Sequence, residues 1–367
     1  MMNESLLKYG QTAFDEYLHK IGEKLQLSSE QRKDIEDNYV ALSSYIEKNS
    51  ELLEDYDEIR VYPQGSYALE TVIKPLKSEQ FDIDIVVEFP KRNTNLSPQQ
   101  FYDSLLQVFS GESRYSKIVE AKNRCVRINY LSTNYYFDIL PVVPSASENM
   151  KRAPDKKLKS WVRTSPIKYR EWFESKSRQR AFLEDMALEK LPKNDQPFPY
   201  KPALKRAVQL IKRARDIYFK DDDTFAPSSI VLTTLFAQSY DGERSTFEAL
   251  KNILSKLKTS YKVLFTLNNP VDPLEEFTEK WKGNISYYTK YQSFINSTLT
   301  NLLILENSQG INQILRTLSG IFGESVTKDI IGDYKLWHEN TVYGVTDKGV
   351  LTSENIVKPA KKNNFHG

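Results

Sequence analysis

Two aspartates stand two residues apart in an apolar run that is typical of a β-strand, FDIDIVVEF over residues 81–89. Because successive side chains of a strand alternate between its faces, Asp82 and Asp84 point the same way. Aspartate is a poor strand former, and neighbouring carboxylates repel each other unless solvent, a cation or protonation relieves them. Asp138 has the same surroundings in YYFDILPVV, residues 135–143. Three converging carboxylates suit two metal ions that clamp the attacking and leaving oxygens of a phosphoryl transfer.

The alternative for these aspartates is a solvated strand face that carries acidic residues by chance. The run around Asp82 and Asp84 is apolar on both faces, which favours a largely covered strand. The third aspartate repeats the pattern. We therefore predict a carboxylate cluster that binds hard cations, Mg2+ or Mn2+.

A Gly-Ser pair precedes the first of these strands. Gly65 and Ser66 lie where EIRVYPQ, residues 58–64, ends and where SYALETVI, residues 66–73, can begin a helix. Glycine permits close backbone approach, and the amide groups and the serine hydroxyl of such a turn can face an anion. Alone, the pair fits a turn with an N-capping serine equally well. Its order with the D-x-D strand and the later aspartate favours a nucleotide triphosphate site.

The elements around these motifs divide into a mixed half and a helical half. Helical spacing predicts long amphipathic helices over about residues 25–54, and short apolar runs predict strands in EIRVY, FDIDIVVEF, RCVRINYL and YYFDILPVV. Between them, Ser97, Pro98 and Gln100 form a capping-box start of a helix. After about Trp161 the strand signals stop and helical signals follow. We predict an α+β chain, with a mixed β-sheet lobe followed by an α-helical lobe.

The helical half contains the runs PALKRAVQLIKRARDIYF, SSIVLTTLFAQSY, NSTLTNLLILE and GINQILRTLSGIFG. Helical geometry places five residues of the first run along one apolar face, which we expect to be buried: Leu204, Val208, Ile211, Ala214 and Tyr218. Lys212 lies at the edge of that face, where a cation can reach a cleft. Its alternative is one more solvated cation of a basic helix.

The composition narrows the classes of function. The 51 basic and 49 acidic residues give a net charge of +2, which disfavours a non-specific nucleic-acid binder. One cysteine and three histidines make a Cys/His zinc site improbable. No apolar run has the length of a membrane span, and the N-terminus lacks the features of a signal peptide. We expect a cytoplasmic protein with no membrane contact.

The motifs PQGSYALETVIKP, FDIDIVVEF and YYFDILPV resemble the catalytic core of the DNA polymerase β-like nucleotidyltransferases. More closely they resemble the CD-NTases, bacterial relatives of cyclic GMP-AMP synthase and oligoadenylate synthase that act in CBASS anti-phage defence. LKRAVQLIKRARDIYF and PSSIVLTTLFAQSY resemble the helices that close over the nucleotide in that family. The resemblance covers residues 62–240 and implies a bilobed nucleotidyltransferase fold with the active site in the cleft.

Carried over residue by residue, Asp82, Asp84 and Asp138 match the family's metal triad, which implies two Mg2+ ions, with Mn2+ as a substitute. The implied nucleotide-binding residues are Gln64, Gly65, Ser66, Lys212, Ser228 and Ser229. The serine pair fits N-capping after Pro227 equally well. Ile230 follows the pair where animal relatives carry a base-stacking tyrosine nearby, so the base preference stays open. The absence of the animal zinc insertion implies no zinc-dependent DNA sensing.

The resemblance implies a Mg2+-dependent enzyme that makes a cyclic oligonucleotide, above all a cyclic dinucleotide, from NTPs with release of pyrophosphate. One alternative is a nucleotidyltransferase with a linear product, such as an oligoadenylate or a modified RNA end or small acceptor. An alternative of another class is an inactive nucleotide-binding scaffold.

We predict three segments along the chain. A catalytic lobe that includes the N-terminal helices covers residues 1–165, and an α-helical lobe that closes over the nucleotide covers residues 166–337. A polar tail over residues 338–367 ends at Gly367 and has no core of its own. In some CBASS systems a partner protein joins the C-terminus of the CD-NTase to other molecules, so the tail is a candidate for that reaction. Disorder without a function is the alternative.

Overall fold

The computed structural model describes residues 13–49, 59–76, 80–89, 96–111, 114–130, 133–145, 150–177, 197–308, 310–328 and 330, and the backbone of 344–345 and 351–352. The predicted tail therefore lies outside the described residues, except for two short antiparallel strands, β10 (Gly344–Val345) and β11 (Leu351–Thr352). Within the described segments, no helix is both long and apolar enough to cross a membrane.

The first half of the chain forms one mixed sheet. Its strands are β1 (Arg60–Pro63), β2 (Phe81–Glu88), β3 (Val119–Ala121), β4 (Val126–Asn129), β5 (Tyr135–Pro144), β6 (Lys151–Asp155) and β7 (Ser160–Thr164). The order is β1-β2-β5-β4-β3, and β6 pairs with both β5 and β7. Strands β2 and β5 are parallel, whereas the other neighbours are antiparallel. The predicted mixed sheet is confirmed.

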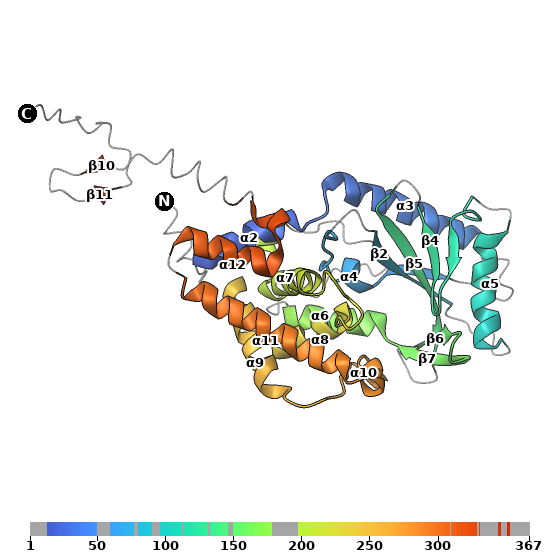
Figure 1. Ribbon diagram of the computed structural model, residues 1–367. Coiled ribbons are helices and arrows are strands. Elements are labelled where there is room, and N and C mark those ends of the chain that lie inside the picture. The colour runs from blue at the N-terminus through green and yellow to red at the C-terminus, as the bar shows by residue number, and fades with distance from the viewer. Residues whose placement is uncertain are drawn as a thin grey trace, which may run out of the picture.

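Two helices cover one face of this sheet, α3 (Ser29–Lys48) and α5 (Pro98–Ser110) (Figure 1). Both begin at a serine whose side chain closes a capping box, and for α5 this is the predicted Ser97–Gln100 pair. Their apolar stripes join Ile83, Ile85 and Phe137 of the sheet in one buried cluster. The D-x-D strand therefore buries its apolar side under these helices, and its aspartates project from the opposite face.

The predicted helix after the Gly-Ser pair is much shorter than expected. It forms a single turn, α4 (Gly65–Ala68), and Glu70 then takes a left-handed backbone conformation with φ of 56°. The following Thr71, Val72 and Ile73 are β-branched residues, which disfavour further helix. The chain leaves the turn as an extended loop.

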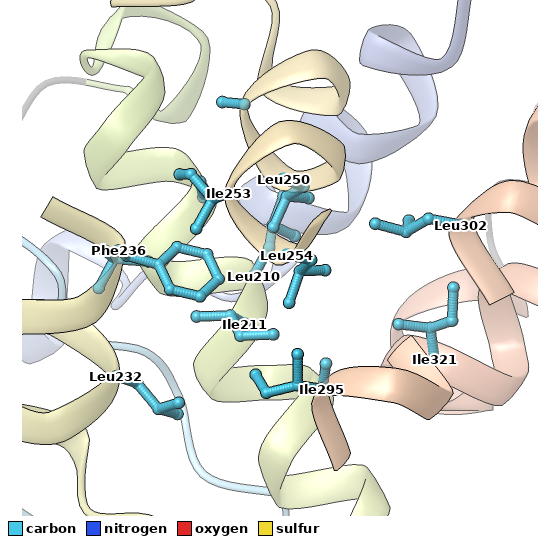
Figure 2. Close-up of a cluster of buried hydrophobic side chains, with 14 of the residues drawn as sticks. Leu210, Ile211, Leu232, Phe236, Leu250, Ile253, Leu254, Ile295, Leu302 and Ile321 are labelled. Carbon is cyan, nitrogen blue, oxygen red and sulfur yellow. The ribbon is translucent and has the colours of Figure 1, made fainter. Parts of the chain in front are cut away.

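The helical half packs around α7 (Ala203–Tyr218). Its other elements are α2 (Ala13–Lys24), α6 (Pro166–Ser177), η2 (Phe198–Tyr200), α8 (Ser229–Ser239), α9 (Thr246–Ser260), α10 (Glu279–Gly283), α11 (Ser286–Glu306) and α12 (Ile311–Phe322). Figure 2 shows Ile211 of α7 among Phe236 of α8, Leu254 of α9 and Ile295 of α11. Helix α2, which the sequence patterns did not predict, packs with this cluster rather than with the sheet.

Burial on α7 differs in two ways from the predicted single face. Leu204, Val208, Ile211 and Ala214 are buried as expected, but Tyr218 is 41% exposed because it lies in the last turn. The polar residues of the first three turns are buried as well, since helices and the loop after α4 surround the helix. Lys212 is among them, with 3% of its surface exposed.

Some strands were missed by the sequence prediction. Strand β6 lies before Trp161 and β7 spans it, whereas the hairpin of β8 (Asn268–Asn269) and β9 (Asp272–Glu276) forms in the part of the chain that was predicted to be helical. Their sequences are short and largely polar, so they carry no clean alternation of apolar residues. Strand β9 lies against β7 and so joins the helical half to the sheet.

Candidate active site

Strand pairing brings the predicted carboxylates together. In the parallel ladder of β2 and β5, Asp84 stands directly opposite Asp138. Asp82 lies two residues before Asp84 on the same strand and the same face. Asp82 is exposed and Asp84 and Asp138 are half-buried, so this face of the sheet is open to a ligand.

The Gly-Ser turn lies against Asp84. The backbone N–H of Gln64 donates to the carbonyl oxygen of Asp84 at 2.9 Å, which holds the turn on β2. Gly65 has φ of 63°, and a Cβ atom placed on it would come within 2.0 Å of Oδ2 of Asp84. Only glycine satisfies both the left-handed backbone and this close approach.

An arginine that the sequence reading missed binds the third aspartate. Arg127 of β4 stands opposite Asp138 in the antiparallel ladder. Its Nε and Nη2 atoms donate to Oδ1 and Oδ2 of Asp138 at 2.8 and 2.9 Å, and its guanidinium lies 3.6 Å from the centre of the Tyr136 ring. These hydrogen bonds raise the pKa of Arg127. Arg127 therefore neutralises and orients Asp138. The sequence signal that could have identified Arg127 is its position in the alternating run RCVRINYL, which was predicted to be a strand.

The carboxylates are chemically suited to a divalent cation. Burial, together with the nearby Asp82 and Asp138, raises the pKa of Asp84 well above its usual range. A bound cation would relieve that repulsion, and carboxylate oxygens are the ligands that Mg2+ and Mn2+ prefer. Among the described residues, no group of three or more His, Cys, Asp or Glu side chains already lies close enough to hold a metal ion.

Lys212 of α7 reaches the loop that follows the Gly-Ser turn. Its Nζ donates to the carbonyl oxygen and to Oγ1 of Thr71 at 3.1 and 3.2 Å. Burial, with a further contribution from nearby Arg215, lowers the pKa of Lys212 to about 8, while Asp82 and Asp84 act in the opposite direction. Ser66 belongs to the same local structure, because its carbonyl oxygen accepts from the Thr71 N–H at 2.9 Å. The lysine and the Gly-Ser turn thus meet at Thr71.

The serine pair lies elsewhere. Ser228 occupies the N-cap position of α8, but its side chain makes no capping hydrogen bond. Ser229 accepts a hydrogen bond from Nη1 of Arg215 at 3.0 Å. Ser228 and Arg215 line a cavity of about 700 Å³ whose lining does not include Asp82, Asp84 or Asp138. The structure therefore does not bring the serines into direct contact with the triad.

A second cavity opens directly beside Asp84. Its volume is about 330 Å³, and Gln64, Gly65 and Asp84 form one side of it. The hairpin β8–β9 contributes Asn269 and Glu275 to the other side. Sequence patterns gave no indication of these hairpin residues, since they come close to the Gly-Ser turn only through the tertiary fold.

Comparison with known proteins supports the resemblance. Residues 12–177 match the model of the Second Messenger Oligonucleotide or Dinucleotide Synthetase domain. A c-di-GMP synthase from Roseivirga ehrenbergii is 30% identical over 369 residues, covering 97% of this chain and 98% of the relative. The cyclic dinucleotide synthase CdnG from Bradyrhizobium diazoefficiens is 24% identical over 335 residues, covering 79% of this chain and 76% of the relative.

The fold agrees with these matches. The structure of the CD-NTase CdnG of Bradyrhizobium diazoefficiens in complex with GTP superposes with a TM-score of 0.71, at 22% identity, over 88% of this chain and 100% of that chain. The predicted α+β nucleotidyltransferase fold is confirmed. With a relative at 30% identity matched over nearly its whole length, this chain belongs to the CD-NTase family, the cyclic GMP-AMP synthase-like nucleotidyltransferases.

Proposed function

We propose that this chain is a cyclic dinucleotide synthase of CBASS anti-phage signalling that joins NTPs and releases pyrophosphate. The observation that carries the proposal is the register of β2 and β5, which sets Asp84 opposite Asp138 while Gly65 contacts Asp84. The curated relatives are named as cyclic dinucleotide synthases, which favours a cyclic product over the linear alternative.

In the proposed reaction, a ribose hydroxyl of one nucleotide attacks the α-phosphorus of another. A new O–P bond forms, the hydroxyl loses its proton, and the bond to the departing pyrophosphate breaks. A second transfer within the linear intermediate closes the ring. Asp82, Asp84 and Asp138 would hold two Mg2+ ions, which supply charge neutralisation and a lowered hydroxyl pKa when bound.

The chain's own residues would supply positioning. We assign the triphosphate to Ser66 and the backbone of the Gly-Ser turn, with Lys212 exchanging its bonds to Thr71 for phosphate oxygens. Arg127 would keep Asp138 in a single orientation until a cation arrives. Ser228 and Ser229 would join the site only after the helical half moves, because the lining of the cavity that contains Ser228 does not include Asp82, Asp84 or Asp138. We also propose that the catalytic lobe ends at residue 165 and that the helical lobe ends at residue 337.

The test is to incubate the protein with each NTP and each pair of NTPs in Mg2+ or Mn2+, treat with phosphatase, and identify resistant species by mass spectrometry. A resistant cyclic dinucleotide is the expected result. Products that phosphatase degrades would favour the linear transferase, and no nucleotide consumption with any combination would contradict the proposal as stated.

The Asp84→Asn variant tests the assignment of the site. We expect it to abolish product formation. Because repulsion and burial disfavour the ionised carboxylate in the folded chain, the neutral amide should not lower the melting temperature. Retained product, or loss of product accompanied by unfolding, would contradict the assignment.

A conjugating partner that acts on the tail ending at Gly367 is a separate proposal, and the tail lies outside the described residues apart from β10 and β11. Deletion of the residues after Val357 should abolish conjugation in the presence of that partner. Unchanged conjugation would remove the idea.

A further inference from the structure

The cavity beside Asp84 has a wall that the proposed chemistry does not use. Asn269 and Glu275 of the hairpin β8–β9 line it, together with the rings of Tyr169 and Phe277. These two rings lie edge to face, with centroids 6.0 Å apart. A cavity of about 330 Å³ with aromatic walls and a few fixed polar groups has the character of a small-ligand site.

Glu275 presents an oriented carboxylate to this cavity. The Nδ2 atom of Asn269 donates to Oε2 of Glu275 at 2.7 Å. The Oδ1 atom of Asn269 accepts from the N–H of Val271 at 3.1 Å, which fixes which end of the amide faces Glu275. Within the described part of the chain, no residue donates a hydrogen bond to the other oxygen, Oε1. That oxygen is left for a donor on the ligand.

Burial and the charges around Glu275 keep the pKa of its carboxyl group near neutrality, so a bound ligand can change its protonation state. Burial raises the pKa of Glu275 to about 7, with Asp272 acting in the same direction and Arg124 and Arg163 against it. Two ion pairs already engage the neighbours, Arg163 with Asp272 and Arg124 with Asp155. A ligand that brings N–H donors to Glu275 would favour the ionised form.

We propose that Glu275, held in place by Asn269, recognises the Watson–Crick edge of a guanine base and so selects GTP over ATP. Guanine offers two adjacent donors on that edge, N1–H and the N2 amino group, which a carboxylate can accept together. Adenine places the acceptor N1 there, whose lone pair would face the carboxylate. Arg124 lines the same cavity, and arginine suits the O6 and N7 acceptors of guanine.

This inference rests on the proposed function, because it assigns a base to the nucleotide whose reacting groups lie at Asp84. It also identifies Glu275 as a specificity residue rather than a catalytic one. A carboxylate can accept from ribose hydroxyls as well, but such a contact would serve ATP and GTP equally.

The test measures dissociation constants of the full unaltered chain by calorimetry for α,β-methylene analogues of GTP, ITP and ATP, which cannot release pyrophosphate. ITP lacks the N2 amino group. We expect GTP to bind more tightly than ITP, and ITP more tightly than ATP. Glu275→Gln should weaken GTP binding about 10- to 100-fold, the range for one charge-assisted hydrogen bond, and leave ATP binding unchanged.

Glu276→Gln is the matched control, because Glu276 is the next carboxylate on β9, pairs with Lys282 and does not line the cavity. It should retain the preference for GTP. Binding of 1-methyl-GTP, which lacks the N1–H donor, repeats the test without a substitution in the hairpin and should be as weak as that of ATP. Equal weakening of GTP and ATP by Glu275→Gln, or tight binding of 1-methyl-GTP, would overturn the inference.

The same experiments separate this inference from the proposed function. Selective GTP binding by a protein that makes no product from any NTP would contradict the synthase proposal and support the role of Glu275. Product formation by a Glu275→Gln variant with the unaltered base preference would contradict the role of Glu275 alone.

Discussion

At the residue scale, the close approach of Gly65 to Asp84 holds the Gly-Ser turn against the carboxylates. The turn cannot shift toward β2 without meeting Oδ2 of Asp84, and the Gln64 N–H bond prevents it from moving away. This contact explains why the glycine is required even though a Gly-Ser pair alone is a weak sequence signal.

Gly65→Ala should therefore reduce product formation at least about 100-fold, because a misplacement of about 1 Å near the reacting groups has an effect of that size. The left-handed backbone should cost about 1–3 kcal/mol in the free energy of unfolding, and displacement of the Asp84 side chain by the added Cβ should add to that cost. Product yield and chemical denaturation measure the two effects.

Gly242→Ala is the control for backbone strain. Gly242 also has a positive φ, 96°, but no atom lies within 4 Å of the position of its added Cβ. We expect the cost of the left-handed backbone alone, without a loss of product. If both variants lose product equally, the contact with Asp84 does not explain the effect.

The titration of Lys212 should make the affinity for NTP depend on pH. Its pKa of about 8 means that its charge, and with it the attraction for a triphosphate, is present below pH 8 and is lost as the pH rises. The affinity for a non-hydrolysable NTP should therefore fall between about pH 7 and about pH 9. In Lys212→Met the affinity should be about 10- to 100-fold weaker at pH 7 and should lack this fall. An unchanged slope in that variant would assign the titration to another group.

At the element scale, one face of α7 holds the loop that follows α4. Lys205, Gln209 and Lys212 are spaced so that they share that face. Lys205 forms ion pairs with Glu70 and with Glu174 of α6. Gln209 Nε2 donates to the carbonyl oxygen of Val72 at 2.6 Å. These contacts fix the loop after the Gly-Ser turn relative to α7.

Lys205→Met tests this arrangement. Lys205 is 1% exposed, so its loss removes a buried cation from between two carboxylates, and we expect a loss of about 3–5 kcal/mol in the free energy of unfolding. Denaturant titration measures it. Lys258→Met, at an exposed position of α9, should change stability by less than about 0.5 kcal/mol. Similar losses in both variants would show that the ion pairs contribute little.

At the scale of the whole molecule, the contacts between the described parts of the sheet half and the helical half include α7 against the loop after α4 and the hairpin β8–β9 against β7. At the second place, Nε of Arg163 donates to both carboxylate oxygens of Asp272, at 3.0 and 2.8 Å. The cavity beside Asp84 lies between these joints and takes residues from both halves. Its shape therefore depends on how the halves are held together.

Arg163→Met should loosen the hairpin, because Asp272 is only 1% exposed and would lose its ion-pair partner. We expect the KM for the preferred NTP to rise several-fold, with a loss of about 1–3 kcal/mol in stability, since Arg163 itself is partly exposed. Steady-state kinetics and thermal melting measure both. Arg316→Met, at an exposed position of α12, should change neither. An unchanged KM in Arg163→Met would show that the hairpin does not depend on this pair.

The sequence alone determined the features that depend on neighbours in the chain. Alternation placed Asp82 and Asp84 on one face of a strand, the serine and glutamine spacing began α5, and the order of motifs indicated the family. The tertiary structure alone decided the pairing of Asp84 with Asp138, the binding of Asp138 by Arg127, and the placement of Glu275 in the cavity that Gly65 also lines. These contacts join segments that are far apart in the chain. They depend on how the strands pair and how the two halves pack, and local sequence patterns contain no information about either.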